Sequence, residues 1–138
     1  MNVLFFLTPK SKIKCVNEQM TVRQVLEIFE HYRYQVIPII SKDGKYVRSI
    51  SEGDLLYYLK NNINNKIEHF EDFNIMEVSN YRSYKSIKID TDIKTLYELL
   101  LAQNFVPVID DKEIFIGIIT RKSILDYVKK YLKTEYNN

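Results

Sequence analysis

An internal repeat is the feature that most constrains how this chain of 138 residues can fold. Aligning Pro38 with Pro107 sets an offset of 107 − 38 = 69 residues, and the same offset brings further identical residues into register. These pairs are Ile40 with Ile109, Ile50 with Ile119, Leu56 with Leu125 and Tyr58 with Tyr127. Upstream the offset becomes 71, with Val16 on Ile87 and Phe29 on Leu100. The sequence therefore predicts two copies of one structural unit.

Each copy has the pattern of a helix, a strand, a turn, a second strand and a second helix. In the first copy, apolar residues at Val22, Val25 and Phe29 follow the spacing of an amphipathic helix, for which Thr21 is a suitable N-cap. The β-branched run that follows predicts a buried strand, although Pro38 favours an edge position or a strand start. The expected ranges are 21–32 (helix), 36–40 (strand), 41–45 (turn), 46–50 (strand) and 52–60 (helix), then 91–103, 105–109, 110–113, 114–119 and 122–131 in the same order.

The segment between the copies divides the chain into domains. Residues 61–65 are too polar for a core, whereas apolar residues within 67–78 predict a short helix. We therefore assign residues 1–62 to the first repeat, 63–83 to a linker with a short helix, and 84–138 to the second repeat. The expected fold class is α+β (mixed α/β), two pseudo-symmetric repeats that each pack a small sheet on helices. Because units of about 60 residues bury only about 60% of their unfolded surface, the repeats are expected to pack on each other.

The charge pattern and the apolar pattern exclude two classes of partner. The 20 basic and 18 acidic side chains give 20 − 18 = +2 with no basic block, which argues against nonspecific nucleic-acid binding. Charged residues recur throughout, so no window reaches the roughly 18 uninterrupted apolar residues of a membrane span. The apolar run at residues 3–7 lacks the positive segment of a signal peptide, and the single cysteine, Cys15, suits a reducing compartment. We therefore expect a cytoplasmic protein without membrane contact.

Residues for catalysis or metal binding form no recognisable group in the sequence. His31 and His69 have no His, Cys or carboxylate neighbours at metal-ligand spacing. No Ser-His-Asp order, nucleophile elbow or Gly-rich phosphate loop occurs, and the chain has only three glycines. Many of the tyrosines and phenylalanines fall on apolar stripes and strands, where core packing explains them better than base stacking. We therefore expect no catalysis, no metal and no cofactor.

The turn from the second strand into the second helix carries polar residues in both copies. Ser51 and Thr120 stand there, where a hydroxyl and the amides at a helix start can bind a phosphate. Asp54 follows on the first helical turn and can accept hydrogen bonds from both hydroxyls of a ribose. The alternative is that Ser51 and Thr120 are helix caps and that Asp54 complements the helix dipole, and spacing alone favours this alternative.

These stretches resemble the cystathionine-β-synthase (CBS) domain, and the whole chain resembles a tandem pair of such domains, called a Bateman module. The resemblance is carried by residues 36–40 with 49–56 and by 105–109 with 117–125, each an apolar strand through Pro followed by a Gly-apolar-x-Ser/Thr-x-x-Asp pattern. Arg48 stands where the family prefers Gly, and Ser123 stands in the Asp position. The resemblance implies regulatory binding of adenine nucleotides in two clefts, which these departures make unequal.

The resemblance also implies which residues form each cleft. Each site would combine the motif of one repeat with the residues before the strand and before the helix of the other. The first site would use Ser51, Asp54, Lys85, Gln103 and Asn104. The second would use Lys12, Lys14, Tyr34, Gln35, Thr120, Arg121 and Lys122, a basic set suited to several phosphates. By position alone, Arg121 and Lys122 fit a solvated first helical turn equally well.

The second set is similar to that of small stand-alone CBS proteins of Gram-positive bacteria that bind cyclic di-AMP, in which a Thr and two basic residues hold phosphate. We therefore expect binding of AMP, ATP or cyclic di-AMP and signalling to an unidentified effector protein. Apolar residues on the helices after the motifs, together with Tyr58 and Tyr127, predict a homodimer. Two alternatives stay open: a structural dimerisation module with degenerate, ligand-free clefts, and an adaptor for a nucleic acid or an enzyme that acts through its aromatic surface.

Overall fold

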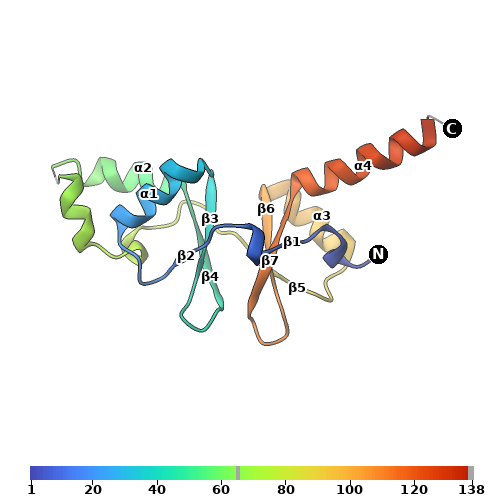
Figure 1. Ribbon diagram of the computed structural model, residues 1–138, viewed down its shortest axis with the longest axis horizontal. Helices are drawn as coiled ribbons and strands as arrows, with labels where there is room; N and C mark the ends of the chain where they lie inside the picture. The colour runs from blue at the N-terminus through green and yellow to red at the C-terminus, as the bar shows by residue number, and fades with distance from the viewer. Residues whose placement is uncertain (65, 137–138) are drawn as a thin grey trace. The chain divides into compact units, whose positions relative to one another are not determined.

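The chain forms two compact units, each with a small sheet packed on helices (Figure 1). The structure is a computed structural model that describes residues 1–64 and 66–136, so Asn65 of the expected linker and residues 137–138 of the expected second repeat lie outside the described residues. Unit 1 consists of residues 1–13 and 84–138, and unit 2 consists of residues 14–83. The expected α+β class is confirmed by the elements of both units.

Unit 2 is built on a three-stranded sheet in the order β2-β3-β4. The middle strand β3 (Val36–Ile40) pairs in parallel with the short β2 (Val16–Asn17) and antiparallel with β4 (Tyr46–Ser51). Helix α1 (Val22–Tyr32) precedes β3, and α2 (Glu52–Asn61) follows β4. The core consists of apolar residues from these helices and strands: Val16, Val22, Val25, Phe29, Ile37, Ile39, Ile50 and Leu55.

Unit 1 repeats this plan with one more strand, in the order β1-β7-β6-β5. The strand β6 (Phe105–Ile109) pairs in parallel with β5 (Ile87–Lys88) and antiparallel with β7 (Phe115–Thr120), whose other edge pairs with β1 (Thr8–Pro9). Helix α3 (Ile93–Ala102) precedes β6, and α4 (Arg121–Tyr136) follows β7. Two 3-10 helices, η1 (Val3–Phe6) and η2 (Lys10–Lys12), flank β1.

The predicted helices and strands are confirmed, with shifts at their ends. Thr21 caps α1 through a capping box that Gln24 completes. In the second repeat the cap is Asp92, whose carboxylate accepts a hydrogen bond of 2.7 Å from the Thr95 N–H, so α3 begins at Ile93 and not at residue 91. Helix α4 runs to Tyr136, beyond the expected end near residue 131.

The two strand prolines lie in the middle strands of their sheets, so the expected edge position or strand start is wrong. Pro38 pairs with Ser49 of β4, whereas β2 pairs only with residues 39–40 of β3. Pro107 has the same place beside β5. Because each short neighbouring strand pairs beyond the proline, the missing N–H interrupts no paired position on that side.

Residues 1–13 at the N-terminus pack in unit 1 together with the second repeat, whereas residues 1–62 were expected to form the first domain. Strand β1 pairs with β7, and the side chains of Val3 and Phe6 are buried in the core of unit 1. The apolar run at the start of the chain is therefore part of a folded core. It leads into β1, where Thr8 pairs with Ile118, 110 residues further along the chain (118 − 8 = 110), and local spacing does not encode such a tertiary contact.

The expected linker of residues 63–83 also differs from its prediction, because it belongs to unit 2. It forms two 3-10 helices, η3 (Ile67–Asp72) and η4 (Ile75–Glu77), in place of one short helix. Phe70, Ile75 and Val78 from this segment are buried in the core of unit 2. Two of the apolar residues that predicted a helix, Phe70 and Ile75, are thus core residues of unit 2.

Gly117 allows β1 to lie against β7. It pairs with Pro9, and a Cβ atom at this position would come within 2.2 Å of the Thr8 carbonyl oxygen. The matching residue in unit 2 is Arg48, since 48 + 69 = 117, and its guanidinium donates a hydrogen bond of 3.1 Å to the Met76 carbonyl oxygen. Backbone pairing in unit 1 is therefore replaced by side-chain hydrogen bonds in unit 2.

Candidate functional site

The first motif forms a complete capping box at the start of α2. The Ser51 hydroxyl accepts a hydrogen bond of 3.1 Å from the Asp54 N–H, and the Asp54 carboxylate accepts one of 2.9 Å from the Ser51 N–H. This satisfies amides that a helix start leaves unpaired. The capping alternative that spacing favoured is therefore confirmed for Ser51.

Asp54 has further partners that its spacing did not predict. Its side chain accepts hydrogen bonds from the Tyr81 N–H at 2.7 Å and from the Asn80 side-chain amide at 3.2 Å. The residue is only 2% exposed. Above it, the ring of Tyr81 stacks on that of Tyr57 with centroids 4.6 Å apart. Asp54 therefore holds the segment after η4 against the start of α2.

Arg48 holds the same segment from the side of β4. Its guanidinium donates to the carbonyl oxygens of Ile75 and Met76 and to the side-chain oxygen of Asn80. Burial lowers the pKa of Arg48 below its usual value, and the nearby carboxylate of Asp54 opposes that shift. The two charged side chains thus flank Asn80, and Arg48, which stands where the family prefers Gly, has hydrogen-bond partners in its own unit.

A hollow of about 180 Å³ lies on the outer side of this cluster. It is lined by Asp54, Tyr57, Tyr58, Asn61, Asn62, Glu77, Ser79 and Tyr81. Burial raises the pKa of Tyr58, and the negative charge of Glu77 raises it further. The lining of the hollow includes two carboxylates, Asp54 and Glu77, which suit hydroxyl and amine groups better than phosphate.

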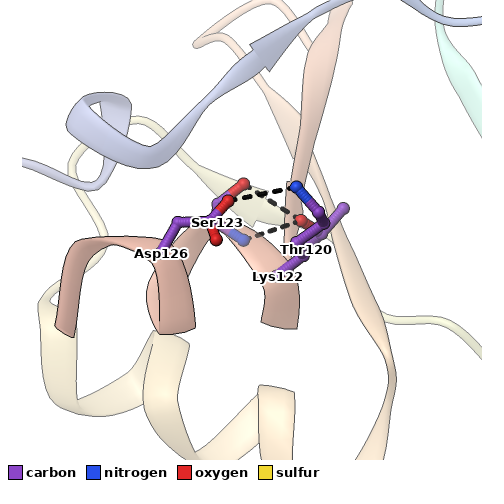
Figure 2. Close-up of polar contacts among 4 residues, drawn as sticks. All are labelled: Thr120, Lys122, Ser123 and Asp126. Atoms are coloured by element: carbon purple, nitrogen blue, oxygen red, sulfur yellow. Dashed lines mark hydrogen bonds and ion pairs between the residues drawn. The ribbon is translucent and has the colours of Figure 1, made fainter. Parts of the chain in front are cut away.

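The second motif caps α4 without a carboxylate, and Figure 2 shows its polar contacts. The Thr120 hydroxyl accepts a hydrogen bond of 3.1 Å from the Ser123 N–H and shares a second one of 3.0 Å with the Ser123 hydroxyl. Ser123 thus supplies no carboxylate, as expected from its place at the family's Asp position. On the exposed side of α4, Lys122 forms an ion pair of 3.2 Å with Asp126 (Figure 2).

Arg121 caps the neighbouring helix. Its Nε donates a hydrogen bond of 2.7 Å to the Leu100 carbonyl oxygen, and its Nη2 donates one of 3.3 Å to that of Leu101. These are carbonyls of the last turn of α3, where a positive charge is favoured by the helix dipole. Part of the donor capacity of Arg121 is therefore used inside unit 1.

The residue before each middle strand lies beside the motif of its own repeat. The Glu52 N–H donates to the Gln35 carbonyl oxygen at 2.9 Å, and the Arg121 N–H donates to that of Asn104 at 3.3 Å. These pairs are equivalent, since 35 + 69 = 104 and 52 + 69 = 121. In unit 1 the Asn104 side-chain oxygen is buried and has no hydrogen-bond partner among the described residues.

Gln103 is a structural residue of unit 1. Its side chain accepts a hydrogen bond from the Lys85 N–H at 2.9 Å and donates to the carbonyl oxygens of Lys85 and Phe105 at 3.0 and 2.9 Å. It is 7% exposed. Its amide therefore fixes the backbone of Lys85, whose side chain is on the surface.

The remaining expected residues lie on the surface around these elements. In unit 2, the Lys14 ammonium lies 5.9 Å from the centre of the Tyr32 ring, which stacks on Tyr34 with centroids 5.6 Å apart. Lys12 and Gln35 are exposed, Lys12 at the end of η2 in unit 1. Within each unit the structure brings some of the expected residues together: Ser51 with Asp54 in unit 2, and Lys85 with Gln103 and Asn104 with Arg121 in unit 1.

Sequence reasoning missed the role of Asn80 and Tyr81. The internal repeat contains one signal for this segment. At the offset of 71, Thr8 and Pro9 of the first copy align with Ser79 and Asn80 (8 + 71 = 79, 9 + 71 = 80). Both segments lie beside the second strand of a repeat, β1 along β7 and Asn80 hydrogen-bonded to the Ser49 carbonyl oxygen at 2.6 Å.

The family model of the CBS domain matches this chain twice, at residues 7–61 and 77–130. The chain therefore belongs to the CBS domain family, as a tandem pair of CBS domains. The first match begins next to β1, and the second begins shortly before Asn80. Each match therefore includes one of the two segments that lie beside the second strand of a repeat.

Solved structures share this fold. CbpB in complex with c-di-AMP has a TM-score of 0.88 and 24% identity over 99% of this chain and 90% of that chain. A CBS domain protein from Streptococcus pneumoniae TIGR4 has a TM-score of 0.82 and 26% identity over 93% and 86% of the two chains. CBSX2 in complex with AMP has a TM-score of 0.76 and 23% identity over 94% and 97%. A search of curated proteins finds no match.

Within residues 1–64 and 66–136, no three His, Cys, Asp or Glu side chains lie close enough to hold a metal ion. In the same part of the chain, no helix has the length and apolar character needed to cross a membrane. Neither the family match nor the solved neighbours indicate an enzymatic family.

Proposed function

We propose that this chain is a non-catalytic regulatory module that binds an adenine nucleotide, AMP, ATP or cyclic di-AMP, and signals its occupancy to a partner protein. Family membership supports this proposal, as do neighbours of the same fold that hold c-di-AMP or AMP. We place it in the cytoplasm, which suits its single cysteine. We further propose that it acts as a homodimer, as its apolar helix faces predict.

The observation that carries the proposal is the unpaired side-chain oxygen of Asn104. A buried acceptor without a donor costs about 1 to 3 kcal/mol, so such an atom is favoured where a ligand supplies the donor. Asn104 lies next to the first residue of α4, to which its backbone is hydrogen-bonded. The exocyclic amino group of adenine is a donor of the required kind, whereas guanine has an acceptor oxygen at that position.

The start of α4 supports a phosphate on the same ligand. The Lys122 N–H and the Thr120 hydroxyl are suitable donors there, whereas the Arg121 and Ser123 N–H groups already donate to the Asn104 carbonyl oxygen and the Thr120 hydroxyl. The dipole of a helix of this length also favours an anion at its start. Lys122 is 86% exposed and its ion pair with Asp126 is on the surface. Such pairs contribute about 0 to 1 kcal/mol, so Lys122 can exchange Asp126 for a phosphate at little cost. We assign Lys12, Lys14, Tyr34, Gln35 and Arg121 to the same phosphate-rich site.

The Asp54 side of the molecule is proposed to bind ribose, with Ser51, Lys85 and Gln103 in the same site. Asn104, which the sequence places in that site, is assigned to the ligand at the start of α4 instead, because its backbone is hydrogen-bonded to Arg121. The assignment of ribose to Asp54 now carries a condition, because Asp54 already accepts three hydrogen bonds from the chain itself. A ribose can reach the carboxylate only if the Tyr81 N–H or the Asn80 amide leaves it. The geometry therefore favours tight binding at the Thr120 motif and weaker binding at the Asp54 motif.

Thermal denaturation with a ligand panel tests the proposal. We expect AMP, ATP or cyclic di-AMP to raise the melting temperature, since a ligand at 100 times its Kd stabilises the folded state by about 2.7 kcal/mol. GMP at the same concentration should have a much smaller effect. Asn104→Ala should remove most of the adenine shift, whereas the exposed control Asn64→Ala should keep it. S-adenosylmethionine and NADH complete the panel as other adenosine ligands.

The competing function predicts a different result. A structural dimerisation module with ligand-free clefts would show no shift with any nucleotide while remaining a dimer. Equal shifts with AMP and GMP would instead remove the role given to Asn104.

A further inference from the structure

The hollow beside Asp54 has a lining that the proposed nucleotide function does not use. The later turns of α2 form one side of it, and residues 77–81 form the other. All of its lining residues belong to unit 2, so the hollow is complete within one unit. Its volume of about 180 Å³ lies below the range of about 300 to 1,000 Å³ that is typical of pockets for drug-sized ligands. A ligand that fits this hollow is therefore smaller than a nucleotide.

Three tyrosines give the hollow aromatic walls. Tyr57 of α2 and Tyr81 stack on each other with ring centroids 4.6 Å apart, which ties the two sides of the hollow together. Tyr58 packs against Phe70 of the core with ring centroids 5.9 Å apart. The fold itself holds these rings in place, so a short hydrocarbon chain can lie against them without ordering new side chains.

The charged side chains of the lining are both negative. They are Asp54 and Glu77, and none of the other lining residues is basic. Asp54 is buried and keeps its hydrogen bonds to its own unit, so it contributes its charge from the inner end of the hollow. Glu77 is exposed and forms no ion pair with any residue in 1–64 or 66–136. A small cation in the hollow would therefore meet a carboxylate that has no counter-ion.

The polar groups of the lining suit a ligand that donates hydrogen bonds. The Asn62 side-chain nitrogen donates to the Tyr58 carbonyl oxygen at 2.8 Å, so the side-chain oxygen is what Asn62 can offer a ligand. The Glu77 carboxylate is likewise an acceptor. Burial raises the pKa of Tyr58 and the charge of Glu77 raises it further, which places that carboxylate near the phenol. An alkylammonium group has three N–H donors and no acceptor, so it matches this set.

We propose that this hollow binds a primary alkylammonium group, with the ammonium beside Glu77 and the hydrocarbon chain against Tyr57 and Tyr58. A free small amine and the lysine side chain of another protein share this chemistry. The inference does not rest on the proposed nucleotide function, because two carboxylates disfavour a phosphate in the same place. Asp54 also keeps all its hydrogen bonds when the amine binds, whereas a ribose needs one of them to leave.

A titration of the isotope-labelled protein with n-butylammonium, followed by nuclear magnetic resonance, tests the proposal. We expect saturable shifts of the backbone amides of Tyr58, Glu77 and Tyr81 at millimolar amine. n-Butanol has the same chain without the charge and should bind about fivefold more weakly or less. Tetramethylammonium, a cation without N–H donors, should also bind more weakly than n-butylammonium.

Glu77→Gln is the decisive variant, because it removes the charge of an exposed side chain and changes its size little. It should weaken the binding of n-butylammonium about threefold. Glu27→Gln, at an exposed position of α1 in the same unit, is the matched control and should bind like the wild-type protein. Absence of saturable binding would overturn the proposal, and so would equal binding of n-butanol, tighter binding of tetramethylammonium or an unchanged affinity of Glu77→Gln.

A third ligand distinguishes the two sources of the amine. Tighter binding of Nα-acetyl-lysine methylamide than of n-butylammonium would assign the hollow to a lysine side chain, and the reverse order would assign it to a free amine. The melting-temperature shift with AMP should be the same for Glu77→Gln and the wild-type protein. Failure of the amine site therefore leaves the nucleotide proposal standing, and a protein that binds no nucleotide can still bind the amine.

Discussion

The Tyr81 N–H donates a hydrogen bond of 2.7 Å to Oδ1 of Asp54, which joins the segment between the repeats to the start of α2. The other carboxylate oxygen accepts from the Ser51 N–H and the Asn80 side chain. Asp54 is thus an acceptor for three donors of its own unit. A carboxylate expected to bind a ligand is also the residue that holds the chain segment next to it.

The first prediction concerns this structural role. Asp54→Ala should lower the free energy of unfolding by about 1 to 3 kcal/mol, because it leaves donors unpaired at a buried place. Urea denaturation followed by circular dichroism measures the change. Asp126→Ala is the matched control, since its carboxylate is exposed and pairs only with a surface lysine, so that change should stay within about 0.5 kcal/mol. If the two variants were equally stable, the role given to Asp54 would be wrong.

The second prediction concerns the close approach of β1 to β7. Gly117→Ala should destabilise the protein by about 1 to 3 kcal/mol, because the added methyl group would come within 2.2 Å of the Thr8 carbonyl oxygen and displace β1. Gly53→Ala is the control, because its Cβ would lie at an ordinary 3.7 Å from the Ser51 hydroxyl in the first turn of α2. That variant should be neutral or stabilising by up to about 1 kcal/mol. Differential scanning calorimetry of both variants checks the pair, and a stable Gly117→Ala protein would contradict the packing of β1.

Much of the fold follows from the sequence because each repeat is governed by local patterns. The capping box at Thr21 and the β-branched run before Ser41 are short-range signals, and the second copy repeats them in register. The short strands β2 and β5 were not predicted, although Val16 and Ile87 align at the offset of 71. Two-residue strands carry too few residues to show a period, so their existence depends on the strands beside them.

The assignment of segments to units could not follow from local patterns. The burial of Val3 depends on β1 reaching β7, and that contact depends on the absence of a side chain at Gly117. The same reasoning explains the candidate site. Spacing identified Ser51 with Asp54, but the partners Asn80 and Tyr81 come from a segment 26 and 27 residues further along the chain. Such partners are set by tertiary packing, which a single sequence does not specify.

The third prediction concerns the phosphate contacts proposed at the start of α4. Lys122→Ala should weaken binding of ATP or cyclic di-AMP about threefold to tenfold and adenosine hardly at all, because the lysine contributes only a point charge. Calorimetry at increasing salt should show weaker binding of the phosphorylated ligands, since the screening length is about 8 Å at physiological ionic strength. Lys129→Ala, an exposed lysine of the same helix, is the control. If adenosine bound as tightly as its phosphates, the basic site would not exist.

The last prediction concerns alkaline pH. The pKa of Tyr58 is raised above its usual value of 10.0, because burial and the negative charge of Glu77 both disfavour the phenolate. A group whose folded pKa is raised contributes stability that is fully present below its unfolded pKa and is lost as the pH rises through the folded value. The wild-type protein should therefore lose stability from about pH 10 upward, and Tyr58→Phe should lose less over the same range. Urea midpoints from about pH 8 to about pH 11 measure this difference. Tyr131→Phe, at an exposed position of α4, should follow the wild-type curve, and an identical curve for Tyr58→Phe would contradict the shift.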